Sequence, residues 1–265
     1  IEVVSFDDQD DPTVAVEVAR QIAADARFVA VVGHRLSSTS LAAAPIYEAA
    51  GIPMITPTAT ANDVTSNCEW CFRTIFDNDT QGKMIASYLL GILDIDHAVV
   101  IAEDSDYGSS LASGFQLVFE EDGGEIAAQY VLPADVSQSD QQMQQVAEEI
   151  ARDHNETVVL LATGSGLADQ ALVDLRNAGV NGIIFGSDST SSRLFLQQAN
   201  ANSAAQGGGV VTDDFYASAP IFIDSLNGDS VRLAAKILDE FGELPTWRSF
   251  TRFRLLRARA DAFGR

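Results

Sequence analysis

Short apolar runs alternate along this chain with longer segments whose apolar residues recur every three to four positions. In residues 28–60, the β-branched run 28–32 predicts a buried strand, 41–50 predicts a helix ended by Gly51, and 52–55 predicts the next strand. Hydroxyl-rich loops follow both strands, at residues 33–40 and 56–60. Because parallel strands end at the same edge of a sheet, we expect both loops to contribute to one ligand site.

The same alternation continues to residue 241 and predicts βαβ units throughout, hence an α/β fold with parallel sheets flanked by helices. Further strands are expected at residues 1–6, 72–76, 97–102, 125–132, 157–162 and 182–186, with another beginning in the glycine-rich segment 207–212. Further helices are expected at residues 13–26, 81–93, 109–121, 138–152, 167–178, 192–198 and 229–241.

The amino-acid composition of the chain disfavours several classes of function. The chain has 265 residues, 46% of them apolar, and so can bury a full core as one large or two small domains. Its net charge of −22 argues against nucleic acid and disfavours anionic membrane surfaces. Two explanations of the negative charge are equally good: adaptation of the protein to salt, and a genome that favours arginine and aspartate. We find no apolar run long enough to span a membrane and no visible signal peptide.

Two segments resemble metal or redox motifs only in part. Cys68 and Cys71 form a C-x-x-C pair, but no second pair or nearby histidine completes a zinc site, and the position does not suit a thioredoxin-like centre. We therefore expect either a local disulfide or two free thiols. The acidic residues 7–11 are spaced like a calcium loop but lack its glycine and its distal glutamate. No metal site is predicted.

The end of the chain differs from the rest in charge. Residues 247–265 carry six arginines against the single acid Asp261. A nucleic-acid-binding arm would suit this charge but not the acidic body that precedes it, so an ordinary helix is expected.

Five blocks together resemble a known family: GHRLSSTSLAAAPIYEAAGIPMITPTAT, FRTIFDNDTQGKMIASYLL, VVIAEDSDYGSSLASGF, VVLLATGSGLADQALVDLRNAGV and IIFGSDST. In this order they are similar to the branched-chain amino-acid-binding proteins of ABC transporters, which are type I periplasmic binding proteins of the receptor ligand-binding family. The resemblance covers roughly residues 3–245. It implies two Rossmann-like lobes, lobe 1 from residues 1–78 and 214–265 and lobe 2 from residues 79–213.

Against the family pattern the chain looks truncated. The first strand and helix of lobe 1 are not found, and the arginine-rich end replaces an apolar, tyrosine-containing helix, which suggests a truncated or frame-shifted end.

The resemblance implies an extracytoplasmic substrate-binding protein of an ABC importer. Such a protein binds a branched-chain-like amino acid, or a related amine or amide, between two lobes that close on it, and delivers it to a membrane permease. The expected location is periplasmic or extracellular, and a lipid anchor is compatible with it. A ligand-sensing domain of a receptor or regulator with the same fold is the alternative, and a hydrolase is a remote one.

The resemblance also assigns the ligand contacts. Ser37 and Thr60 would provide hydroxyls to an α-carboxylate, with backbone groups at Thr58 and Thr60 and with Ser38 in the same loop. Asp188 would pair with the α-ammonium group, and Tyr107 would line the wall of lobe 2. The structural alternatives are that the hydroxyls cap helices and turns, that Asp188 is a helix N-cap and that Tyr107 is a packed rim aromatic.

One position departs from the family pattern. Gly164 stands where amino-acid binders carry a second aromatic residue. Loss of the ring would open the pocket or make it more polar, so the ligand could be larger than leucine or not an α-amino acid.

Enzyme motifs are missing from the sequence. There is no nucleophile elbow, no P-loop and no G-x-G-x-x-G after a strand. The histidines His34, His97 and His154 are scattered, and Ser37 three residues after His34 does not make a triad. We predict no catalytic residue and no cofactor.

Overall fold

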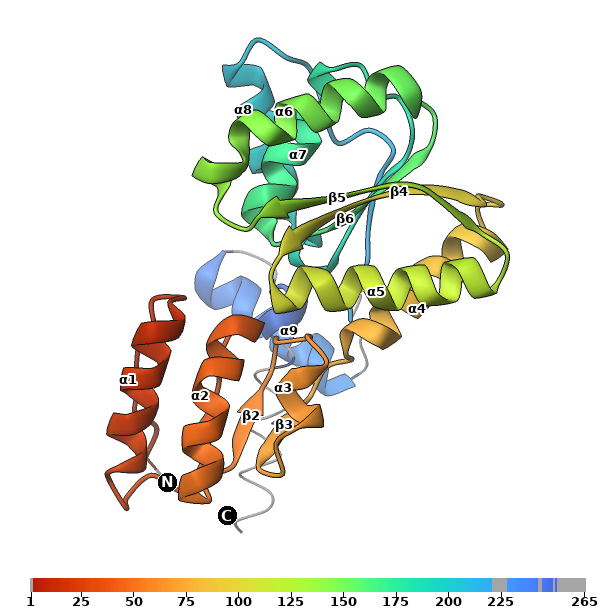
Figure 1. Ribbon diagram of the computed structural model, residues 1–265. Helices are drawn as coiled ribbons and strands as arrows, with labels where there is room; N and C mark the ends of the chain where they lie inside the picture. Colours follow the sequence, from red (N-terminus) through yellow and green to blue (C-terminus); the bar gives the residue numbers. More distant parts are fainter. Residues whose placement is uncertain (1, 221–227, 243–244, 250, 252–265) are drawn as a thin grey trace. The chain divides into compact units, whose positions relative to one another are not determined.

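The computed structural model describes residues 2–220, 228–242, 245–249 and 251. The chain divides into two compact units, which are described here one at a time. Unit 1 comprises Ile1–Asp77 and Pro220–Arg265, and unit 2 comprises Asn78–Ala219. Both are built from alternating helices and parallel strands, so the α/β prediction is confirmed (Figure 1).

Unit 1 holds a parallel sheet of strand order β1-β2-β3. Its described elements are α1 (Pro12–Ala23), β1 (Val31–Val32), α2 (Ser37–Ala50), β2 (Met54–Thr56), α3 (Asp63–Ser66), β3 (Cys71–Arg73) and α9 (Gly228–Phe241). Asp11 caps α1 by accepting the N–H groups of Thr13 and Val14, and α2 ends where Gly51 adopts a left-handed φ of 64°. Helices α1 and α2 lie side by side, and their apolar faces share a core with Met54 and Val64 (Figure 1).

Unit 2 holds a parallel sheet of strand order β5-β4-β6-β7-β8. Its elements are α4 (Asn78–Gly91), β4 (His97–Asp104), α5 (Asp106–Glu121), β5 (Glu125–Pro133), α6 (Val136–Asp153), β6 (Val158–Ala162), α7 (Ser165–Asn177), β7 (Ile184–Gly186), the 3-10 helix η1 (Asp188–Thr190), α8 (Arg193–Ala205) and β8 (Phe215–Ala217).

Both faces of this sheet are covered by helices, which explains the continuous apolar runs of its strands. Alternate residues of β4 point to opposite faces: Val100 packs with α4 and α5, whereas Ile101 packs with α6 and α7. Helices α4 and α5 cross so closely that a Cβ atom on Gly82 would lie 2.4 Å from the backbone nitrogen of Phe115. Glycine is therefore required at this crossing.

Several expected elements are wrong in position. Residues 2–6 form no strand, residues 28–30 precede β1 rather than belong to it, and residues 207–212 form no strand. A strand exists only where a neighbour offers ladder hydrogen bonds, and an apolar, β-branched run does not reveal that neighbour. Helix α2 begins at Ser37 rather than at residue 41, so Ser37 and Ser38 lie in its first turn and not in a free loop.

The expected return to lobe 1 near residue 213 is also misplaced. Strand β8 pairs in parallel with β7, with Phe185 opposite Tyr216, and so extends the sheet of unit 2. Unit 2 consequently continues to Ala219. The arginine-rich segment expected to form a helix lies mostly outside the described residues. Among the described helices, none combines the length and the apolar character needed to cross a membrane.

Candidate ligand-binding site

The first candidate loop of unit 1 joins β1 to α2. Its helix begins after Leu36, which has extended backbone and a side chain that cannot cap the first turn. The first N–H groups of a helix lack partners within the helix, and the helix dipole favours negative charge there. This uncapped end of a 14-residue helix is thus suited to an anion. Ser37 is buried at that end, and Ser38 is half-buried.

The second loop, residues 57–62, follows β2 and is held against the first by three hydroxyl groups. Thr56 donates to the carbonyl of His34 at 2.8 Å, and Thr58 donates to the carbonyl of Arg35 at 2.6 Å. The N–H of Ala61 donates to Ser37 Oγ at 3.1 Å. The structure therefore brings Ser37, Thr58 and Thr60 into one cluster within unit 1.

These contacts separate the candidate hydroxyls by role. The hydroxyl of Thr58 donates its hydrogen to the backbone carbonyl of Arg35. It can therefore accept a further hydrogen bond but cannot donate one to a carboxylate. Ser37 accepts the N–H of Ala61 and keeps its own hydrogen for donation. Thr60 differs from both: its side chain is fully buried, and Oγ1 has no hydrogen-bond partner among the described residues.

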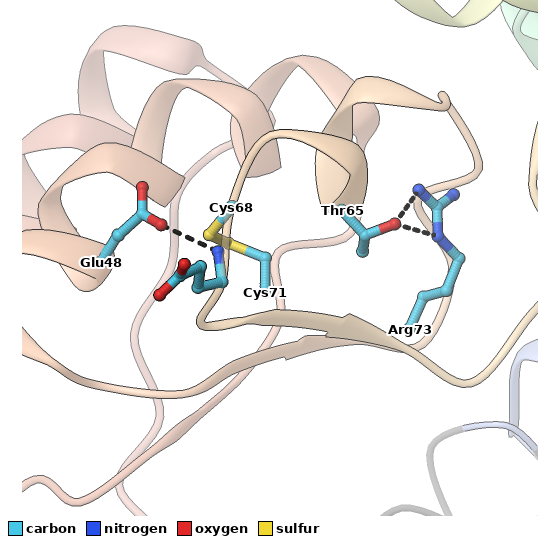
Figure 2. The surroundings of a disulfide bond; sticks show 6 residues. Glu48, Thr65, Cys68, Cys71 and Arg73 are labelled. Atoms are coloured by element: carbon cyan, nitrogen blue, oxygen red, sulfur yellow. Dashed lines mark hydrogen bonds between the residues drawn. A yellow bond between two sulfur atoms is a disulfide. The ribbon is translucent and has the colours of Figure 1, made fainter.

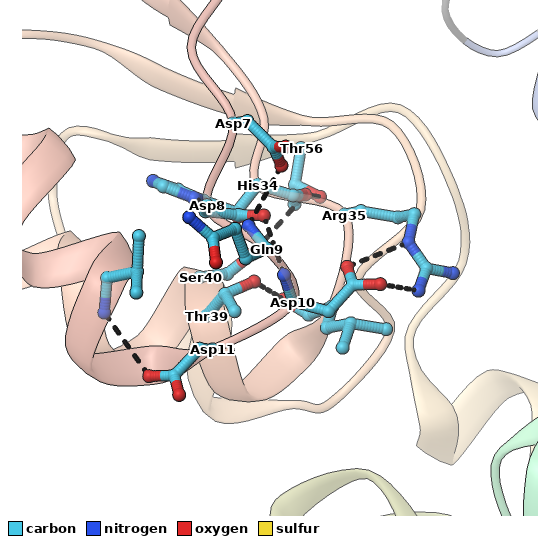
Figure 3. A network of polar contacts seen from close by, with 12 residues as sticks. Asp7, Asp8, Gln9, Asp10, Asp11, His34, Arg35, Thr39, Ser40 and Thr56 are labelled. Atoms are coloured by element: carbon cyan, nitrogen blue, oxygen red, sulfur yellow. Dashed lines mark hydrogen bonds and ion pairs between the residues drawn. The ribbon is translucent and has the colours of Figure 1, made fainter.

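An acidic segment, residues 7–11, braces the first loop (Figure 3). His34 Nδ1 lies 2.6 Å from Asp8 Oδ2, and Arg35 contacts both carboxylate oxygens of Asp10. Burial raises the pKa of Asp8, but the His34 hydrogen bond, the Asp10 N–H and the charge of His34 together lower it below its usual value. These acids therefore hold the loop in place, which explains the spacing that resembles a calcium motif.

In unit 2 the candidate residues also follow the carboxyl ends of strands. Tyr107 lies in the first turn of α5, and Asp188 follows β7. The hydroxyl of Tyr107 donates to Asp188 Oδ1 at 2.6 Å. Burial and the negative charge of Asp188 raise the pKa of Tyr107 well above its usual range, so the phenol stays protonated and keeps this bond. The N-cap of η1 is Ser187, not Asp188, and the Asp188 residue is only 3% exposed.

Gly164 is the N-cap of α7 and lies beside a second buried acid. Glu103, at the end of β4, accepts the N–H of Gly164 at 2.6 Å and the hydroxyl of Ser105 at 2.7 Å. A Cβ atom on Gly164 would lie 3.1 Å from Glu103 Oε2, so a larger residue would press on this carboxylate. The surroundings of Gly164 are therefore polar.

Cys68 and Cys71 are joined as a disulfide between α3 and β3 (Figure 2). The N–H of Glu69, inside this short loop, donates to Glu48 Oε1 of α2 at 2.8 Å. The disulfide and this bond fix the entry to β3.

Two residues of the site were not predicted. Arg73, the last residue of β3, donates to the backbone carbonyls of the second loop, and Glu103 holds Gly164. The sequence feature that could have revealed Glu103 is its position directly after the apolar run 97–102. For Arg73 it is the presence of a single cation within an apolar, strand-like segment.

Comparison with known protein families identifies the family to which this chain belongs. A family model described as "Periplasmic binding protein" matches residues 1–252. The chain belongs to the periplasmic binding protein family.

Relatives of this periplasmic binding protein agree with that assignment. The Leu/Ile/Val-binding protein of Escherichia coli K12 is 35% identical over 117 residues, which are 44% of this chain and 32% of the relative. The amino acid binding protein of Pseudomonas aeruginosa is 35% identical over 113 residues, 42% of this chain and 30% of the relative. The matched region thus spans about a third of the length of these curated relatives.

Solved structures share the fold. A leucine binding protein from Thermotoga maritima superposes with a TM-score of 0.86 at 21% identity, covering 98% of this chain and 71% of that protein. A branched-chain amino acid transporter substrate binding protein from Streptococcus pneumoniae, in complex with isoleucine, gives 0.81 at 22% identity, covering 97% and 70%. The expected family and its two-lobed α/β fold are confirmed.

Proposed function

We propose that this protein is an extracytoplasmic substrate-binding protein of an ABC importer and that it binds an α-amino acid or a related amine or amide. The observation that carries the proposal is the fully buried Thr60 hydroxyl, which no described residue satisfies, in a loop beside the uncapped end of α2. A carboxylate would satisfy this hydroxyl, because buried polar groups are normally hydrogen-bonded. In this proposal a membrane permease receives the ligand, and the location is periplasmic or extracellular, with a lipid anchor compatible.

Unit 1 offers donors suited to the carboxylate. The hydroxyls of Ser37 and Thr60 and the N–H groups at the start of α2 can bind an anion without a direct charged contact. Thr58 supports this group through its bond to Arg35, and Ser38 adds a hydroxyl in the first turn of α2.

Unit 2 offers an acceptor suited to the ammonium group. Asp188 is buried, and Tyr107 holds one of its oxygens at 2.6 Å, which fixes the orientation of the carboxylate. An ammonium–carboxylate pair is strong where water is excluded. Gly164 and Glu103 make the neighbouring wall polar, so ligands with polar side chains belong in any test beside leucine, isoleucine and valine, which relatives are named for binding.

Binding without turnover fits this arrangement better than hydrolysis does. A hydrolase would need a base beside Ser37. Both ring nitrogens of His34 have other partners, Asp8 at 2.6 Å and the hydroxyl of Tyr47 at 3.2 Å. The Ser37 oxygen accepts a backbone N–H.

Isothermal titration calorimetry with the twenty L-amino acids, their small amides and polyamines tests the proposal. We expect saturable 1:1 binding of one ligand class, weakened about 30-fold or more by Asp188→Asn, because truncating one partner of a buried charge pair typically costs ~2–5 kcal/mol. Asp104→Asn, the same change at an exposed carboxylate ending β4, is the matched control and should bind normally. Absence of binding by the whole panel would refute the proposal.

A further inference from the structure

The guanidinium group of Arg73 is almost entirely engaged by one loop. Its hydrogen bonds go to four consecutive backbone carbonyls and one hydroxyl: Ala59 O at 3.3 Å, Thr60 O at 2.9 Å, Ala61 O at 2.9 Å, Asn62 O at 3.0 Å, and Thr65 Oγ1 at 2.7 and 3.0 Å. Figure 2 shows the last of these contacts, with Arg73 reaching from β3 to α3. The parallel register that places Thr56 opposite Arg73 brings the side chain to the end of β2, where the loop begins.

These bonds determine which way the N–H groups of the loop point. In a planar trans peptide, the carbonyl of one residue and the N–H of the next point in opposite directions. With the carbonyls of Ala59 and Thr60 directed at Arg73, the N–H groups of Thr60 and Ala61 are directed away from it. The Ala61 N–H indeed donates to Ser37 Oγ at 3.1 Å, on the side of α2. The Thr60 N–H is therefore turned in the same direction, toward the donors already assigned to the candidate site.

The charge of Arg73 acts in the same direction. Every acceptor named above is a neutral oxygen, so these contacts do not cancel the positive charge. Burial lowers the pKa of Arg73, and the charge of Asp77 raises it, but an arginine remains protonated in proteins at physiological pH. A cation behind a loop whose N–H groups point outward raises the electrostatic potential on the far side of that loop.

The geometry points to Arg73 as the positioning residue of the anion-binding loop, through which the site selects a ligand that bears a carboxylate over the corresponding amide. This inference rests on the proposed function, because it concerns the same site. Arg73 does not touch the ligand: it orients the Thr60 N–H and adds a positive potential. A purely structural role would predict equal losses for charged and neutral ligands.

The test compares L-leucine with L-leucinamide, which differ in the carboxylate but share the ammonium group, by calorimetry at pH 6.5. In the wild-type protein leucine should bind at least about 100-fold more tightly, since charge-assisted hydrogen bonds are roughly twice as strong as neutral ones. Arg73→Gln should reduce this ratio about 10-fold, with leucine losing most of the affinity. Arg73→Lys keeps the charge and should keep the ratio within about 3-fold, although both affinities fall.

Arg176→Gln is the matched control. Arg176 is a partly buried arginine of α7 that also donates to backbone carbonyls, those of Val180 at 2.7 Å, Gly182 at 2.9 Å and Asp213 at 2.7 Å. Its loss should lower the melting temperature and leave the leucine-to-leucinamide ratio unchanged.

The outcomes separate this inference from the function on which it rests. If Arg73→Gln weakens both probes equally, or if neither Arg73 variant folds, Arg73 is a folding residue only and the inference is wrong. If leucine fails but another amino acid of the calorimetric panel binds, that amino acid and its amide replace the two probes with the same expected ratios. If the wild-type protein binds an amine or amide of the panel but no amino acid, the inference is wrong and the proposed function stands; if it binds no member of the panel, both fail.

Discussion

A buried hydroxyl without a partner reduces stability, and Thr60 is such a residue within the described part of the chain. Its presence is understandable if the hydroxyl is kept for a ligand rather than for the fold. Stability and affinity should then respond in opposite directions when the hydroxyl is removed.

We therefore predict that Thr60→Val leaves the melting temperature of the ligand-free protein unchanged or raises it, while ligand affinity falls about 10-fold or more. Valine keeps the shape of threonine and removes only the hydroxyl. Differential scanning calorimetry and titration calorimetry would measure the two effects. Thr74→Val, at an exposed threonine of the same unit, should change neither. A lower melting temperature with unchanged affinity would contradict the ligand role of Thr60.

Sequence reasoning named these hydroxyl residues as candidates but could not separate their contacts. Thr56, at the end of β2, and Thr58 and Thr60, in the second loop, are identical side chains at alternate positions. Only the contacts show that Thr56 and Thr58 bond to the first loop and that Thr60 does not. Arg73 was missed for the same reason, since its contacts are mostly with backbone carbonyl groups, which every residue carries.

Among the helices, the contact between α6 and α7 contains a carboxylate that is poorly solvated. Burial, together with the negative charge of Asp140, raises the pKa of Asp174 from 3.8 to about 6. One oxygen of Asp174 has no hydrogen-bond partner among the described residues. Folding therefore disfavours the charged form of Asp174, which gains a proton at a higher pH in the folded protein than in the unfolded chain.

We predict that Asp174→Asn stabilises the protein at pH 7.5 and that most of this gain is lost at pH 4. Above the folded pKa of about 6 the wild-type protein carries the full penalty, and as the pH falls from that value towards the ordinary pKa of 3.8 the penalty is progressively lost. Because the group is partly exposed, solvent screening reduces the expected gain at pH 7.5 to about 1 kcal/mol. Thermal melts at both pH values would measure it, with Asp104→Asn as the control. A gain of equal size at both pH values would contradict the assignment.

The loop between α3 and β3 gives a second prediction at the scale of elements. Removing the Cys68–Cys71 disulfide in the double serine variant should destabilise the protein by about 2 kcal/mol, because a cross-link over so short a loop restricts the unfolded chain only modestly. Chemical denaturation with and without reductant measures this. Reductant should lower the free energy of unfolding of the wild-type protein and leave that of the double variant unchanged. If reductant has no effect on the wild-type protein, the disulfide contributes nothing to stability.

Helices were easier to predict from the sequence than strands were. Those of unit 2 were found in the expected order, within a few residues at most ends, because their apolar spacing is intrinsic to each segment. The exception is α8, which was expected to end at residue 198 and continues to Ala205. Strand β1 has two residues where five were expected, and β8 begins at Phe215, after the segment 207–212 in which a strand was expected to begin, because pairing with a neighbour determines where a strand forms. The start of α2 was missed because Leu36 provides no capping side chain as a signal.

At the scale of the whole molecule, the resemblance to a family gave the order of the two lobes and the first crossing within one residue, whereas the second crossing lies several residues later than expected. The chain returns to unit 1 after Ala219 because β8 adds one more strand to the sheet of unit 2. Each unit has apolar clusters of its own: those of unit 2 cover both faces of a five-stranded sheet, and the described cluster of unit 1 surrounds a three-stranded one. Since buried apolar area is the main source of stability, the two units should differ in stability.

The tryptophans allow this difference to be measured. Trp70 and Trp247 are the two tryptophans of the chain, and both belong to unit 1, whereas helical circular dichroism reports on both units. We predict that, in urea, tryptophan fluorescence changes at a lower concentration than the circular dichroism signal, because unit 1 unfolds first. A saturating ligand stabilises the unit that binds it, by about 2.7 kcal/mol at 100 times its Kd, and should move the transition of that unit to higher urea concentration. Coincident transitions without ligand would contradict the prediction and would mean that the units unfold as one cooperative body.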